Sequence, residues 1–202
     1  MERGKFIVFE GIDGAGKSTQ SQLLYRFLKE KRIKVFLTAE PTRGPVGQLI
    51  RFFLKKKKRV NRLALQLLFT ADRADHLEKV ILPLLKKGFW VISDRYFFST
   101  ISYGLLEIKD FSWLHQLNKK FPLPDLTFFI DLPEKEALKR IKKERKNLSL
   151  FEKEKFLKKT RRNYLYLKKR FERIFIINGQ QSIPEVFDEI KKIIFQKVKK
   201  IF

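Results

Sequence analysis

Short runs of apolar residues alternate along the chain with longer segments in which apolar residues recur every three to four positions. The short runs are typical of strands that are buried on both faces of a parallel sheet. The longer segments are typical of amphipathic helices, and they exceed the dozen residues that a parallel crossover needs. The pattern therefore predicts a doubly wound α/β fold, a five-stranded parallel sheet flanked by helices. The predicted strands are 5–10, 35–40, 89–94, 126–132 and 173–178.

Two of the segments between strands carry clear helix signals. Leu23, Leu24, Phe27 and Leu28 fall on one face of a helix that follows the first predicted strand. Pro45 suits the first position of a second helix, because the backbone N–H that proline lacks would have no partner there. We therefore expect helices directly after the first two strands.

The turn after the first strand has a spacing with a specific chemical meaning. Residues 9–19 read FEGIDGAGKST, and Gly11, Gly16, Lys17 and Ser18 satisfy the pattern Gly-x-x-x-x-Gly-Lys-Ser/Thr. Glycines let the chain curl around a phosphate and present successive backbone N–H groups to it. Lys17 is then placed to reach the β- and γ-phosphates, and Ser18 to ligate Mg²⁺. The predicted triphosphate-binding residues are Gly11, Ile12, Asp13, Gly14, Ala15, Gly16, Lys17, Ser18 and Thr19.

Composition limits the remaining possibilities. A chain of 202 residues, 44% of them hydrophobic and with no repeat or low-complexity linker, predicts a single domain over residues 1–202. The absence of cysteine excludes thiolate metal sites, and with only two histidines we expect any metal to arrive with the nucleotide. No signal peptide or membrane-spanning run is evident, so we expect a cytoplasmic protein without a membrane partner.

The net charge raises a different possibility. The chain has 46 Lys and Arg against 22 Asp and Glu, a formal charge of +24, which would attract nucleic acid. The lysines are nevertheless spread along the polar faces of the predicted helices, where solvated surface explains them, and no short signature of a nucleic-acid reader is present. We therefore expect non-specific, salt-sensitive binding and no specific nucleic-acid partner.

Polar residues follow each predicted strand at its carboxyl end. In open α/β sheets ligands bind at this edge. The clustering of carboxylates, arginines and an amide there predicts a site at one rim of the sheet. The residues concerned are Glu10, Asp13, Glu40, Arg43, Asp94, Arg95, Tyr96, Asp131 and Asn178.

Asp94 and Arg95 have two interpretations each. Asp94 ends the third strand, as does the carboxylate that holds Mg²⁺ in phosphate-loop proteins, although a strand-end Asp also commonly caps the next helix. Arg95 could clamp a phosphate through two N–H groups, or could pair with a neighbouring acid.

A further set of chemically useful residues lies on the segment 67–76. Phe69, Asp72, Arg73 and His76 share one face of a helix by their spacing. An aromatic ring and a guanidinium one turn apart form a plausible platform and donor for a base. Alone, Phe69 is more simply explained as a core residue among 21 phenylalanines.

Four motifs together, in order and spacing over nearly the whole chain, closely resemble the thymidylate kinase family. Its members phosphorylate dTMP to dTDP with ATP and Mg²⁺, which implies the phosphate-loop (P-loop) nucleoside monophosphate kinase architecture with a small lid, and a homodimer. The motifs are residues 9–19; Glu40-Pro41-Thr42 with Gly47 and Ile50-Arg51; residues 68–74; and Asp94-Arg95-Tyr96 with Ser99 and Tyr103.

The resemblance implies roles for most residues of the acceptor site, among them Arg43 as the loop arginine that holds the monophosphate. Phe69 would stack on thymine and Arg73 would bond to the base edge. Arg95 would bridge toward the acceptor phosphate, Asp13 would face the sugar hydroxyl, and Tyr103 would lie near sugar and base. The metal residues would be Ser18 and Asp94. The implied dTMP-binding residues are Asp13, Glu40, Arg43, Phe69, Arg73, Arg95, Ser99 and Tyr103.

Residues 140–152 have the charge and position of the family's lid, which folds over ATP. Because Gly14 and Ala15 stand where one subclass carries an arginine in its P-loop, we expect the lid to supply that cation. The lid candidates are Arg140, Lys143, Arg145 and Lys146, although an ordinary basic helix face would look the same. The predicted catalytic residues are Lys17, Arg95, Arg140 and Arg145.

The chain also departs from the family pattern. Ser149-Leu150 replace an Asp-Arg pair common in bacterial lids, and Gly104 follows Tyr103 where relatives often have Gln. Loss of a side-chain amide predicts less strict discrimination of thymine from uracil or other bases. The remaining alternatives are another nucleoside monophosphate or deoxynucleoside kinase and an ATP-dependent nucleic-acid-binding protein. A non-catalytic binding module is disfavoured because Lys17, Ser18 and Asp94 are all present.

Overall fold

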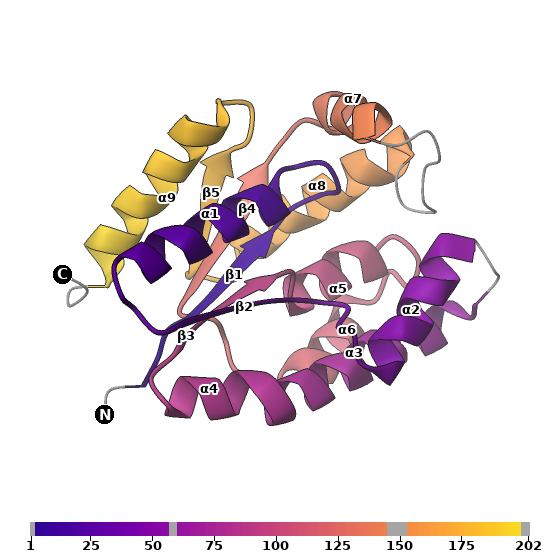
Figure 1. The fold of residues 1–202 in the computed structure, drawn as a ribbon. Coiled ribbons are helices and arrows are strands. Elements are labelled where there is room, and N and C mark those ends of the chain that lie inside the picture. Colours follow the sequence, from indigo (N-terminus) through magenta and orange to yellow (C-terminus); the bar gives the residue numbers. More distant parts are fainter. Residues whose placement is uncertain (1–2, 57–59, 145–152, 199–202) are drawn as a thin grey trace.

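The computed structural model describes residues 3–56, 60–144 and 153–198 (Figure 1). Within them, five parallel strands form one sheet in the order β2-β3-β1-β4-β5, which confirms the predicted architecture. Each strand lies within one residue of its predicted bounds. The strands are β1 (Phe6–Glu10), β2 (Val35–Ala39), β3 (Trp90–Asp94), β4 (Leu126–Asp131) and β5 (Ile174–Asn178).

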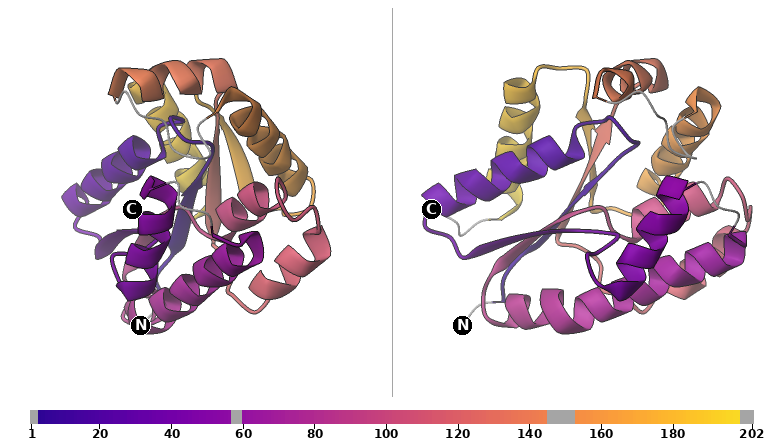
Figure 2. Two further views of the ribbon diagram at one scale, coloured as in Figure 1. Left: turned by 90° about the vertical axis from the view of Figure 1, so that its right-hand side faces the viewer. Right: turned by 45° about the vertical axis from the view of Figure 1, so that its right-hand side comes forward.

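Helices cover both faces of the sheet (Figure 2). The helices α1 and α9 lie on one face, whereas the α3–α4 segment, α5 and α8 lie on the other (Figures 1 and 2). The helical elements are α1 (Lys17–Glu30), α2 (Pro45–Lys56), α3 (Arg62–His76), η1 (Leu77–Ile81), α4 (Leu82–Lys86), α5 (Phe97–Gly104), α6 (Phe111–Asn118), α7 (Glu134–Glu144), α8 (Glu154–Lys168) and α9 (Ile183–Lys197). The predicted helix starting at Pro45 is confirmed.

The elements α3, η1 and α4 form one continuous helix with a π turn inside it. Pro83 lies in the first turn after the π turn, and it has no N–H to donate to the preceding turn. A local change of helical pitch is a common way to accommodate such a residue. The helix therefore continues from the candidate base platform on α3 to the turn before β3.

The central strand β1 is fully enclosed. Phe6, Ile7, Val8 and Phe9 are all 0% exposed, because β3 and β4 flank the strand and helices cover both of its faces. Burial of four large apolar side chains fixes this strand in the core. The loop that follows β1 is consequently anchored at one end in the buried core.

Candidate active site

The loop between β1 and α1 curls tightly at the carboxyl edge of the sheet. Gly14 and Gly16 have φ angles of 77° and 97°, which residues with a side chain rarely adopt. A Cβ on Gly14 would lie 2.6 Å from the carbonyl oxygen of Ala137 on α7. The glycines therefore allow both the bend of the loop and the close approach of α7, in a conformation that presents backbone amides to an anion.

Lys17 is held inside this loop. Its side chain is buried, and Nζ donates a hydrogen bond of 2.8 Å to the carbonyl oxygen of Ile12. Burial, and after it the positive charge of Arg95, lowers the pKa of Lys17 to about 8. The loop thus holds an ammonium group that gains stabilisation when a phosphate arrives beside it.

Ser18 and Asp94, the two predicted metal ligands, lie side by side. The Ser18 hydroxyl donates to Oδ2 of Asp94, while Oδ1 of Asp94 is buried without a hydrogen-bond partner among the described residues. Hydroxyl and carboxylate oxygens are suitable ligands for Mg²⁺, which usually takes few protein ligands and completes its shell with phosphates and water. The described chain contains no cluster of three or more His, Cys, Asp or Glu side chains that could hold a metal.

A cavity of about 810 Å³ opens beside the loop. Of the predicted triphosphate-binding residues, 13–19 line it, whereas Gly11 and Ile12 do not. Arg140 and Lys143 of α7 also line it, and Arg140 donates a 3.0 Å hydrogen bond to the carbonyl oxygen of Gly179. Two of the four lid cations are thereby at the cavity, while Arg145 and Lys146 lie outside the described residues.

A second, smaller pocket of about 100 Å³ lies between α3, α5 and the loop after β2. Seven of the eight predicted acceptor-site residues line it: Asp13, Glu40, Phe69, Arg73, Arg95, Ser99 and Tyr103. Arg43 does not; its side chain is exposed, and its carbonyl oxygen accepts a hydrogen bond from Gln48. Arg51 instead contacts this loop, by donating to the carbonyl oxygens of Pro41 and Thr42.

Arg95 stands where the two cavities meet. Arg95 and Asp13 line both of them, and the two side chains form an ion pair. The Arg95 guanidinium also donates to the Ser99 hydroxyl at 2.9 Å. The backbone of Arg95 has a φ of 77°, a conformation that costs a residue with a side chain on the order of 1 kcal/mol. The fold therefore holds a cation at the junction at some cost in backbone strain.

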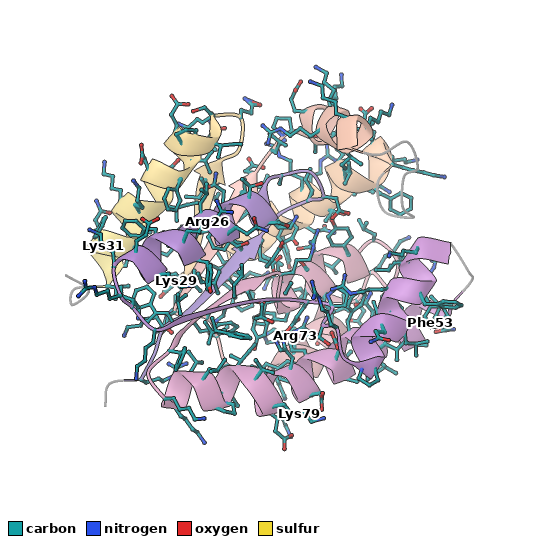
Figure 3. All side chains as sticks on the ribbon, in the orientation of Figure 1. Arg26, Lys29, Lys31, Phe53, Arg73 and Lys79 are labelled. Atoms are coloured by element: carbon teal, nitrogen blue, oxygen red, sulfur yellow. The ribbon has the colours of Figure 1, made fainter. Side chains whose placement is uncertain are left out.

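Arg73 is one of the most buried side chains, and Figure 3 shows it directed into the molecule while Lys79 points outward. Its Nε and Nη2 lie 2.9 and 2.8 Å from Glu40, Nη2 donates to Thr100, and Nη1 donates to Asn118. Glu40 also contacts His76 at 3.2 Å. Arg73 is therefore fixed, before any ligand is present, by partners from the loop after β2, from α5 and from α6.

Glu10, at the end of β1, holds the start of α5 in place through hydrogen bonds. Its buried carboxylate accepts hydrogen bonds from the backbone N–H groups of Tyr96 and Ser99 and from the hydroxyls of Ser99 and Tyr164. Burial raises the pKa of Glu10, against the opposing effect of these hydrogen bonds. Glu10 thus fixes the start of α5 and with it the position of Arg95.

Some residues that line the two cavities were not predicted from the sequence. Gln66, Leu54 and Thr100 line the small pocket, and Gln20 and Gln181 line the large cavity. Gln66 could have been found from its spacing, because it lies three residues before Phe69 on the same helix face. Gln181 follows β5, so its position after a predicted strand was the one sequence signal that placed it at the carboxyl edge of the sheet.

A parallel sheet with a P-loop after its central strand, and a second pocket beside that loop, defines the P-loop nucleoside monophosphate kinase fold. The sequence profile of thymidylate kinase matches residues 9–190. The chain belongs to the thymidylate kinase family.

Similar proteins agree with this assignment. A probable thymidylate kinase of Pyrococcus horikoshii is 43% identical over 194 residues, 93% of this chain and 94% of the relative. A thymidylate kinase of Thermosipho africanus is 43% identical over 196 residues, covering 94% and 96%. The structure of thymidylate kinase from Candida albicans aligns over 99% of this chain and 94% of its own, with a TM-score of 0.85 and 28% identity. No helix in the described ranges is long and apolar enough to cross a membrane.

Proposed function

We propose that the protein transfers the γ-phosphate of ATP to dTMP, which yields dTDP and ADP on the way to dTTP. The observation that carries the proposal is the junction at Asp13 and Arg95, where the P-loop cavity meets a pocket containing Phe69 and Arg73. A donor triphosphate in one cavity and an acceptor monophosphate in the other would bring their reacting groups together there.

The chemistry requires charge neutralisation rather than a strong base, because the acceptor phosphate is already an anion. We assign this task to Lys17, Arg95 and Arg140, which surround the place where the γ-phosphate would be transferred. Mg²⁺, held by Ser18 and Asp94 together with phosphate oxygens, would supply further positive charge to the β- and γ-phosphates.

The nucleoside would occupy the small pocket. Phe69 is half-buried in its wall, so a base could stack on the ring, and Arg73 would donate to the base edge. Asp13 and Tyr103 would lie near the sugar, and Ser99 and Glu40 complete the wall. Arg43, exposed on the loop after β2, would reach the monophosphate only after a change of its side-chain conformation.

We further propose one kinase domain over residues 1–202 with a lid at about 140–152, in which Arg140 and Arg145 approach the transferred phosphate. The position of Arg140 supports this, since its Nη1 lies 4.0 Å from where a Cβ on Gly16 would stand. Exclusion of water by such a lid would direct the phosphate to dTMP.

A cytoplasmic homodimer is the assembly we propose. Leu49 and Phe52 on α2, with Leu63 and Leu67 on α3, are between 37% and 49% exposed and would be covered by a second copy. Light scattering of the purified protein should give twice the mass of one chain. Substitution of Leu63 and Leu67 by Ser should shift the measured mass toward that of a single chain.

The activity is tested with a panel of dTMP, dUMP, dGMP, dCMP and thymidine as acceptors, each with ATP and Mg²⁺, by coupled detection of ADP. We expect the highest kcat/KM with dTMP. A protein that hydrolyses ATP in response to DNA or RNA, and modifies none of these acceptors, would refute the proposal and favour a nucleic-acid-dependent role for the positive charge.

A further inference from the structure

Gln66 occupies a position in the small pocket to which neither the sequence motifs nor the proposed roles give a task. It lies on α3 three residues before Phe69 and seven before Arg73, so the three side chains share one helix face. All three line the pocket. Gln66 is only 3% exposed, so its amide is shielded from bulk water.

The amide of Gln66 has an unused hydrogen-bonding atom. Its buried Oε1 has no hydrogen-bond partner among the residues that the structure describes. A buried acceptor without a partner costs about 1–3 kcal/mol, so a native protein that keeps one usually has a use for it. Because Gln66 lines the small pocket, a ligand bound there is a candidate partner for this atom.

Gly104 makes the space for this amide. A Cβ at position 104 would stand 3.1 Å from Oε1 of Gln66 and 2.8 Å from Cδ2 of Leu114. Any side chain there would press on both groups. The glycine that removes an expected amide from α5 therefore permits a different amide, from α3, in the same neighbourhood.

Arg73 has little hydrogen-bonding capacity left with which to identify a base. Four of its five N–H groups are directed to Glu40, Thr100 and Asn118, which leaves one on Nη1. A single donor pairs with one ring carbonyl: at C2 thymine and cytosine both have one, whereas at C4 only thymine does. Arg73 therefore separates the two pyrimidines only from the C4 side, whereas a group that distinguishes a protonated from an unprotonated ring N3 separates them in either orientation.

We propose that Gln66 provides this discrimination by pairing with the N3–H edge of the acceptor base. An amide carries a donor and an acceptor side by side, and so does an imide such as thymine or uracil, in the complementary order. Oε1 accepts from N3–H and Nε2 donates to the adjacent carbonyl, while Arg73 donates to the carbonyl on the other side. Cytosine presents a lone pair at N3, which Oε1 repels. The inference rests on the proposed function, because it assumes that the small pocket takes the acceptor base.

The test compares dTMP with dCMP in wild type and in Gln66→Met, a side chain of the same length without the amide. We expect kcat/KM for dTMP over that for dCMP to fall at least about tenfold. The KM for ATP should not change, and the melting temperature should stay level or rise because a buried unpaired atom is removed. Gln66→Leu is a second variant in case Gln66→Met does not fold.

Gln20→Met is the matched control. Gln20 is also 3% exposed with an unpartnered Oε1, but it lines the P-loop cavity and donates to the carbonyl oxygen of Ile183. Its substitution should leave the ratio of dTMP to dCMP unaltered, whatever it does to the use of ATP.

Three results would overturn the inference. The first is an unchanged ratio in a folded Gln66 variant, and the second is a lower melting temperature with an unchanged ratio, which would make the amide a structural group. The third needs no variant: wild type binding N3-methyl-dTMP as tightly as dTMP. In all three the wild type still phosphorylates dTMP, whereas failure of the proposed function itself would appear as a wild type that does not.

Discussion

The P-loop cavity and the nucleoside pocket are built in different ways. The cavity, about 810 Å³, is built around one continuous segment, residues 13–19, whose glycine conformations shape the phosphate loop, while α7 and the residues after β3 and β5 complete its wall. The pocket, about 100 Å³, is formed by side chains from separate elements, with the buried pair of Arg73 and Glu40 in its wall. In the cavity, therefore, function should be separable from stability, whereas in the pocket one side chain serves both.

Replacement of Lys17 by Ala should have the largest effect. We expect kcat to fall about 10³-fold or more, because the cation next to the transferred phosphate is lost, with little change in melting temperature. Lys139→Ala, an exposed lysine on α7 paired with Glu136, is the control and should keep the activity. Wild-type kcat in Lys17→Ala would refute the role of the loop in phosphate binding.

In the pocket, by contrast, Arg73→Leu should lower the stability of the fold. Removal of the guanidinium leaves Glu40 buried without its main partner, and we expect the free energy of unfolding to drop by about 3–5 kcal/mol in urea titrations. Arg62→Leu on the same helix removes only a 3.7 Å ion pair with Glu107, in which the Arg62 side chain is exposed, and should cost under about 1 kcal/mol. Equal costs for the two variants would break the distinction between the two regions.

Arg95→Ala probes the junction between the regions. We expect kcat/KM for dTMP to fall about 10²-fold, while the melting temperature changes much less, because Ser99 and Asp13 keep other contacts or are accessible to water. Combining it with Asp13→Asn in a double-mutant cycle measures the ion pair itself. If stability and activity fall together, Arg95 is a structural partner of Asp13 and not a catalytic residue.

The smallest effect is expected from pH. Lys17, with a pKa of about 8, is charged below that pH and must take up a proton to pair with phosphate above it. The affinity for ATP should therefore be level up to about pH 8 and then fall by up to about tenfold per pH unit. Calorimetry in buffers of different ionisation enthalpy should detect the proton uptake. Lys17→Arg, which stays charged, should abolish this dependence, and an unchanged profile would assign it to another group.

The same contrast explains what the sequence could predict. The strands and the P-loop follow from local patterns, because burial of β1 and the spacing of Gly11, Gly16 and Lys17 act within one stretch of chain. The helix face with Phe69 and Arg73 also follows from local spacing.

The rest depends on contacts between distant residues. The loop after β2 is held by Asp72, which accepts hydrogen bonds of 2.7 and 2.6 Å from the backbone N–H and the hydroxyl of Thr42. No local sequence pattern predicts that contact. The contact fixes a loop on which the Arg43 side chain is exposed. The burial of Arg73 likewise depends on Asn118, which lies 45 residues away.

The backbone at Arg95 has a consequence for any attempt to make the protein more heat-resistant. With a φ of 77°, position 95 would suit glycine better than arginine. A library of random variants selected only for thermal stability would therefore favour Arg95→Gly, which removes the cation between donor and acceptor. At this residue, higher stability and retained activity are opposing requirements, so a screen must measure both.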